Sequence, residues 1–100
     1  MIVIFHQDWP GDLERAAHYY EEQAGRELRQ DFIHEAFATI ERIKTNPLAF
    51  MQLYGPVRRA RLKRFRFHSI RFRFIDETNT LRILGIIHAS RHPDTAKDRR

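Results

Sequence analysis

Hydrophobic and polar residues alternate along residues 57–74, and this alternation is the strongest pattern in the chain. The segment reads VRRARLKRFRFHSIRFRF, with an apolar side chain at close to every second position. A period of two is typical of a β-strand with one packed and one solvated face. Phe65 and Phe67 fall at odd positions, whereas the apolar residues of 70–74 fall at even positions. This change of parity predicts a bend, bulge or short turn near residues 66–69, giving two strands or one bulged strand.

Two amphipathic helices are predicted before this segment. Apolar residues recur at helical spacing over residues 13–24 and again over 28–43, where the apolar face is wider. Asp8 or Asp12 is expected to cap the first helix, and Gly25 to close it in a left-handed conformation. An Asn-Pro pair ends the second helix. Because one or two residues join the helices, we expect an antiparallel hairpin.

The remaining segments complete the predicted sheet. Residues 2–6 are β-branched and precede turn residues, which predicts a first strand. Residues 48–56 are expected to form a loop along the edge of the core. Residues 76–79 are predicted to form a polar turn. Residues 81–88 are apolar on both faces, which predicts a strand interior to the sheet or covered by the helices.

The order of these elements predicts an α+β fold. It consists of an N-terminal strand, an antiparallel two-helix hairpin and a largely antiparallel sheet of three to four strands. The 100 residues are 42% hydrophobic and 31% charged, which predicts a single soluble domain over residues 1–100. Its tail, from about residue 91, lacks an apolar anchor and is expected to be loosely ordered. The chain has no cysteine, and its first apolar run is too short for a signal peptide or a membrane span, so we expect a cytoplasmic protein.

Positive charge is concentrated in the second half of the chain. Residues 1–56 hold 5 basic and 9 acidic side chains, whereas residues 57–100 hold 13 basic and 4 acidic ones. The basic side chains of the alternating segment are Arg58, Arg59, Arg61, Lys63, Arg64, Arg66, Arg71 and Arg73. Like charges on paired strands repel each other, so such a face indicates an acidic partner, either nucleic acid or protein. Among the interleaved phenylalanines, we expect most to build the core rather than stack on bases.

Three stretches carry a resemblance to a known family. They are Tyr19-Tyr20-Glu21 in the first helix, RRARLKRF at residues 58–65 followed by Phe67, and HASRHP at residues 88–93. With the order of elements, they resemble the RelE/ParE superfamily of type II toxins over almost the whole chain. The resemblance implies a growth-inhibiting toxin of a chromosomal or plasmid-stabilising pair. It also implies neutralisation by a cognate antitoxin in a hetero-oligomer of the two.

Two modes of action follow from the resemblance: ParE-like members bind DNA gyrase, and RelE-like members cleave mRNA on the ribosome. We favour the ParE-like, non-enzymatic mode, because family nucleases commonly place a tyrosine or histidine in the C-terminal segment and this chain has no tyrosine after Tyr54. Aromatic residues that many members carry after the Arg-x-Pro are also replaced here by Asp-Thr-Ala. The expected target- or antitoxin-binding residues are Arg58, Arg59, Arg61, Arg64 and Arg91.

Two alternatives stay open. As a nuclease, the chain would hold phosphate with Arg59, Arg61 and Arg91, and His88 or His92 would move a proton. As a non-toxic nucleic-acid-binding module, it would show steeply salt-dependent binding. We expect no cofactor and no metal, because a His/Glu pair four residues apart in the first helix lacks a visible third ligand.

Overall fold

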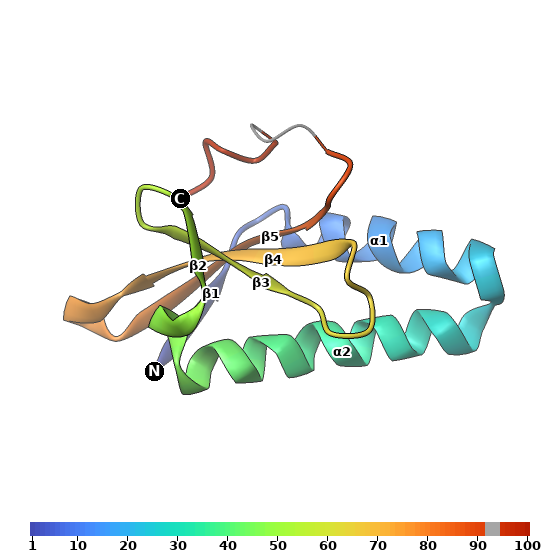
Figure 1. The fold of residues 1–100 in the computed structure, drawn as a ribbon, viewed down its shortest axis with the longest axis horizontal. Coiled ribbons are helices and arrows are strands. Elements are labelled where there is room, and N and C mark those ends of the chain that lie inside the picture. The colour runs from blue at the N-terminus through green and yellow to red at the C-terminus, as the bar shows by residue number, and fades with distance from the viewer. Residues whose placement is uncertain (92–94) are drawn as a thin grey trace.

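Five strands form a single sheet in the order β1-β5-β4-β3-β2 (Figure 1). The computed structural model describes residues 1–91 and 95–100. Its elements are β1 Ile2–Phe5, α1 Trp9–Ala24, α2 Arg26–Thr45, β2 Met51–Tyr54, β3 Val57–Arg61, β4 His68–Ile75 and β5 Thr80–His88, with short 3-10 turns at Pro47–Ala49 and Asp76–Thr78. β1 pairs with β5 in parallel, and all other neighbours are antiparallel. The predicted α+β fold is confirmed.

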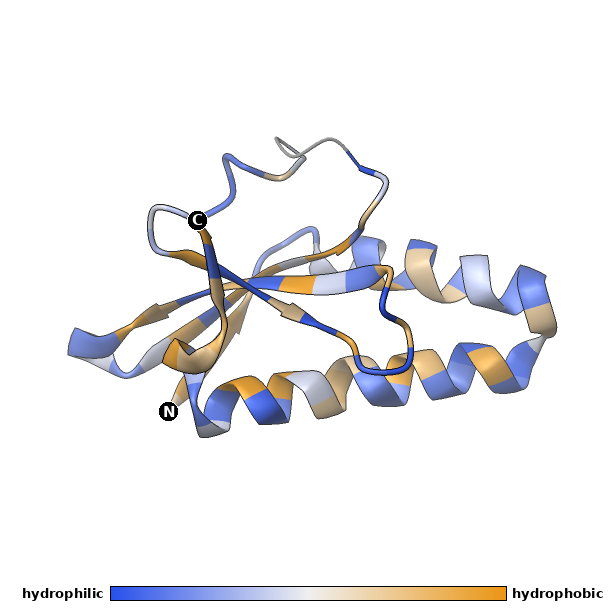
Figure 2. Cartoon of the chain, in the orientation of Figure 1, coloured by the Kyte–Doolittle hydropathy of each residue, from blue (hydrophilic) through white to orange (hydrophobic). Residues whose placement is uncertain are grey.

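The two helices cover one face of the sheet and build the core against it. Buried residues of both helices, among them Ala17, Phe32 and Ile40, pack in one cluster with Ile70 and Phe72 of β4 and with their neighbours on β3 and β5. Figure 2 shows hydrophobic and hydrophilic bands alternating along both helices, as the amphipathic pattern predicts. Burial of these apolar side chains is the main contribution that holds the hairpin on the sheet.

The helix ends follow the sequence only in part. Asn46 ends α2 directly before the proline, as predicted. Gly25 has the predicted positive φ of 89°, but its ψ of −173° is extended rather than left-handed helical. Asp8 stands at the N-cap of α1 without a side-chain cap bond, and Asp12 lies inside the first turn. The predicted cap is therefore wrong: both carboxylates pair with Arg99, which is a charged partner and so a stronger one than a backbone N–H.

The prediction of a loop over residues 48–56 is also wrong, because Met51–Tyr54 is the edge strand β2. Gly55, with φ 49°, and Pro56 form the tight turn into β3. Four residues with no regular alternation gave too weak a strand signal. A break within residues 57–74 is confirmed, but residues 62–67 form it. It lies earlier than the predicted residues 66–69, because His68 and Ser69 already pair with β5. The predicted interior position of the last strand is confirmed as well, because β5 lies between β1 and β4.

Candidate functional site

Arginine side chains occupy the face of the sheet opposite the helices. Along β4, Ile70 and Phe72 are buried toward the helices, so Arg71 and Arg73 point to the other face. Register places Arg59 of β3 directly opposite Arg71 and places Arg82 of β5 directly opposite Arg73. Two directly opposed like-charge pairs destabilise a sheet when nothing compensates them. The fold therefore maintains a cationic face that does not help its own stability.

Part of this face forms a hollow of about 320 Å³, which we call the arginine hollow. The guanidinium-bearing residues that line it are Arg59, Arg61, Arg66, Arg71 and Arg91. Tyr54, Ser69, Ile87 and His88 also contribute to its lining. Among the described residues that line the hollow, none carries a carboxylate. The hollow is therefore a concentrated, positively charged surface that is open to a ligand.

Two arginines of the hollow donate hydrogen bonds to neutral groups. Arg59 donates to the Met51 Sδ at 3.0 Å, and Arg71 donates to the Thr95 carbonyl oxygen. Within residues 1–91 and 95–100, no ion pair involves any of the five hollow arginines. Their charge is thus available to a partner.

The structure brings only some of the predicted binding residues together. Arg59, Arg61 and Arg91 share the hollow. Arg64 instead forms an ion pair with Asp31 of α2, with 2.9 Å between Nη1 and Oδ2. Arg58 points to the helix side of the strand and donates to the Phe50 carbonyl oxygen at 2.8 Å. The functional role of all five predicted arginines stays a prediction.

Arg66 and Arg71 line the hollow; both belong to the basic face predicted from the sequence, but neither was among the expected binding residues. Arg71 could have been found by strand parity, because it shares a face with its cross-strand partner Arg59. Arg66 lies in the irregular segment between β3 and β4, where no periodicity fixes the direction of a side chain.

A buried tyrosine hydroxyl adds a second feature to the hollow. In the part of the chain that the structure describes, the Tyr54 hydroxyl is buried without a hydrogen-bond partner. Tyr54 lines the arginine hollow. An unpaired buried hydroxyl costs about 1–3 kcal/mol of folding stability.

His88 lies at the rim where β5 ends and lines the arginine hollow. Its Nδ1 accepts a hydrogen bond from the Ser90 backbone N–H at 2.9 Å. Nδ1 is therefore the unprotonated nitrogen, and the proton of the neutral ring is on Nε2. His92, the other predicted imidazole, lies outside the described residues.

His68 stands directly opposite His88 on β4, but it belongs to the core. It is 4% exposed, and its Nδ1 lies 2.9 Å from the Tyr20 hydroxyl. Burial, together with the nearby His88, lowers the pKa of His68 to about 4. Burial also raises the pKa of the Tyr20 phenol, with smaller contributions from Tyr19 and Glu35. His68 is thus a neutral structural side chain near pH 7.

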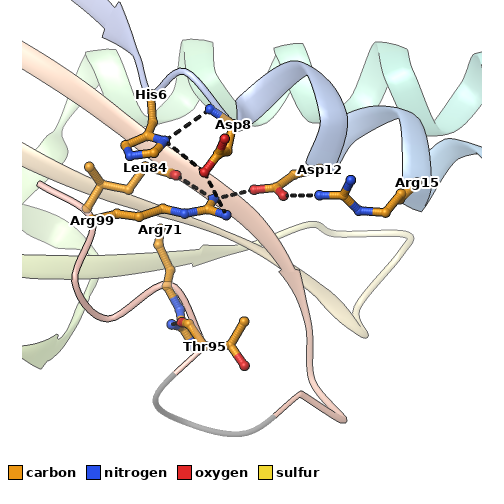
Figure 3. Close-up of polar contacts among 8 residues, drawn as sticks. All are labelled: His6, Asp8, Asp12, Arg15, Arg71, Leu84, Thr95 and Arg99. Carbon is orange, nitrogen blue, oxygen red and sulfur yellow. Dashed lines mark hydrogen bonds and ion pairs between the residues drawn. The ribbon is translucent and has the colours of Figure 1, made fainter.

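The C-terminal segment returns to the sheet through Arg99 (Figure 3). Arg99 donates to the Asp12 carboxylate and, at 3.0 Å, to the Leu84 carbonyl oxygen. Asp8 lies 3.7 Å from the same guanidinium. Gly85 makes room for this contact, because a Cβ there would lie 2.6 Å from the Arg99 Nη1. These polar contacts attach the described end of the tail, and loose order from residue 91 stays a prediction.

A second hollow, of about 500 Å³, lies between α1, β5 and this C-terminal segment. Asp12 lines it and forms ion pairs with both Arg15 and Arg99, and Arg91 lines it as well. Two of the three arginines that line it share the Asp12 carboxylate, so its excess of positive charge is smaller than that of the arginine hollow, and it attracts an anionic ligand less strongly.

The exposed His18 and Glu22 of α1 lie close together, with 3.4 Å between Nε2 and Oε1. No group of three or more potential metal ligands occurs in the described part of the chain.

Within residues 1–91 and 95–100, no helix is long and apolar enough to cross a membrane.

A helical hairpin over one face of a mostly antiparallel sheet, with an uncompensated cationic hollow on the other face, defines a small α+β protein suited to binding an acidic partner. A family model described as ParE toxin of type II toxin-antitoxin system, parDE, matches residues 3–93. The chain therefore belongs to the ParE toxin family and is the toxin component of a type II toxin-antitoxin system. This membership implies a cognate antitoxin as partner. A comparison with curated proteins gave no match.

Proposed function

We propose that this toxin inhibits growth by binding DNA gyrase through the arginine hollow, and that the antitoxin neutralises it by covering the same hollow. The observation that carries the proposal is the set of five arginines around one hollow, with no carboxylate among its described lining residues. Membership of the ParE toxin family supports the gyrase-binding mode over cleavage.

The chemistry of the hollow indicates what an antitoxin segment should supply. Carboxylates would pair with the guanidinium groups in a partly desolvated setting, where charge-assisted bonds are strongest. Leu53 and Ile87 add apolar lining, which favours a segment that mixes acidic and apolar side chains.

A supercoiling assay with purified gyrase tests the proposal. The wild-type toxin should inhibit supercoiling, and the cognate antitoxin should restore it. Arg59→Ala/Arg61→Ala should raise the half-inhibitory toxin concentration by about tenfold or more, because losing two charge-assisted contacts costs at least 1.4 kcal/mol. The matched control Arg26→Ala/Lys44→Ala removes the same charge from α2, outside the hollow. Unimpaired supercoiling with wild-type toxin would exclude gyrase as the target.

One observation favours a second candidate function, ribosome-dependent cleavage of mRNA. His88 lies in the arginine hollow, so a proton-transferring group and phosphate-binding cations share one site. Since Nδ1 accepts from the Ser90 backbone N–H, the neutral ring can donate a hydrogen bond to a phosphate through Nε2. To transfer a proton, His88 would first have to release the Ser90 contact so that Nδ1 becomes available as the basic nitrogen. Mapping of mRNA 5′ ends after expression distinguishes the two: in-frame cleavage abolished by His88→Gln would establish the nuclease, and intact messages with growth arrest would exclude it.

A further inference from the structure

Phe67 is the most exposed of the phenylalanines, at 68%. Phe65 and Phe72 of the same basic segment are buried in the core cluster, as expected from the sequence. Phe67 lies in the irregular connection between β3 and β4, where no strand pairing forces its side chain outward. Core packing therefore does not account for an aromatic ring at this position.

The Phe67 ring is nevertheless held in a defined place. It stacks on the His88 imidazole, with ring centroids 6.0 Å apart and ring planes at 17°. The Ala89 backbone N–H donates to the Phe67 carbonyl oxygen at 2.7 Å, which ties the connection to the end of β5. Tyr19 of α1, 46% exposed, makes an edge contact with the same imidazole, with the ring centroids of Tyr19 and His88 6.1 Å apart. We call Phe67, His88 and Tyr19 the aromatic platform.

The aromatic platform adjoins the arginine hollow. His88 belongs to both, and Arg66, which precedes Phe67 in the chain, lines the hollow. A flat ring with an open surface thus stands beside several guanidinium groups that have no carboxylate partner in the described residues. Bases and phosphates alternate in this way along an unpaired nucleic-acid strand, where rings stack and cations neutralise the backbone.

We propose that this surface binds single-stranded nucleic acid, with a base stacked on Phe67 and the adjoining phosphates in the arginine hollow. The proposal goes beyond gyrase binding, because it assigns the chain a direct nucleic-acid contact that needs no protein target. An acidic peptide would use the arginines but would gain little from the exposed ring. A duplex would present phosphates but keep its bases stacked inside the helix, so it is expected to bind more weakly.

Equilibrium binding to three labelled probes tests the proposal: oligo-dT and oligo-rU strands of about 15 nucleotides and a DNA duplex of the same length. Wild-type protein should bind a single strand more tightly than the duplex. Phe67→Ala should weaken single-strand binding by about 5- to 100-fold, the loss expected for one stacked base. Arg59→Ala/Arg61→Ala should lower the slope of log K against log salt by about 1.4. The ratio of the dT and rU affinities identifies whether DNA or RNA is the preferred strand.

Two variants make the test specific for stacking. Phe37→Ala removes another exposed phenylalanine, 43% exposed and on α2, and should leave the affinity unchanged. Phe67→Trp should retain binding and report it by fluorescence quenching, because the natural Trp9 is the chain's only tryptophan and is buried. Duplex binding as tight as single-strand binding, or an unchanged affinity of Phe67→Ala, would overturn the proposal. The Phe67→Ala protein can also be tested in the gyrase supercoiling assay. Loss of single-strand binding with gyrase inhibition retained, or the reverse, would distinguish the nucleic-acid proposal from the gyrase proposal.

Discussion

His68 stays neutral in the core because its imidazole is buried beside Tyr20 and opposite His88. Its pKa of about 4 in the folded chain lies below the value of 6.5 that an exposed histidine has. Between these two values the unfolded chain binds a proton that the folded chain does not, so the free energy of unfolding should fall as the pH falls. For this residue, the loss between pH 6.5 and pH 4 should be on the order of 2 to 3 kcal/mol.

Urea denaturation at several pH values measures this effect against His68→Gln, which does not titrate and can still bond to Tyr20. For each protein, the free energy of unfolding is plotted against pH. The difference in slope between wild type and His68→Gln gives the contribution of His68 apart from that of the carboxylates. His34→Gln, at an exposed position on α2, should reproduce the wild-type slope. Identical slopes for wild type and His68→Gln would contradict the neutral, buried state of this imidazole.

At the scale of elements, the Asp12–Arg99 pair joins the C-terminal segment to α1 and β5. Among the described residues, Asp12→Ala leaves the Arg99 guanidinium, 16% exposed, with only the more distant Asp8 as an acidic neighbour, and should cost about 3 kcal/mol of unfolding free energy. Arg99→Ala should cost less, because Arg15 still pairs with Asp12 at 2.7 Å. In a double-mutant cycle measured by urea denaturation, the double variant should lose less than the sum of the two single losses.

A surface pair supplies the control for this cycle. Glu22→Ala removes the exposed partner of His18 and should change stability by no more than about 0.5 kcal/mol. Strictly additive losses for Asp12 and Arg99 would show that the contact contributes no coupling energy.

Most of the elements could be predicted from sequence, because their signals are periodic. Helical spacing located α1 and α2, and the change of parity located the break between β3 and β4. The short strand β2 was missed, since four residues cannot show a period, and its place at the sheet edge comes from pairing with β3. The caps were missed because Arg99 lies far away in the sequence yet competes for Asp8 and Asp12. Contacts between residues so far apart in the sequence are determined by the tertiary fold and not by the local sequence pattern.

For the molecule as a whole, the sequence predicted a cationic surface but not its composition. Alternation alone cannot tell which arginines the protein itself neutralises. Asp31 of α2 pairs with Arg64, and only the packing of the hairpin against the sheet brings these two charges together. Arg59 and Arg71, by contrast, are neighbours because of strand register. The charges of the molecule are therefore segregated. Most acidic residues lie in the helical half, and the opposite face carries a hollow of arginines that have no ion-pair partner among the described residues.

The most direct test of the arginine hollow measures growth arrest. It compares the Arg59→Ala/Arg61→Ala toxin with the Arg26→Ala/Lys44→Ala toxin at equal expression. If the hollow carries the toxicity, the first variant should lose growth arrest and antitoxin capture together, and the second should keep both. Full toxicity and full antitoxin binding in the Arg59→Ala/Arg61→Ala variant would contradict the assignment of the arginine hollow.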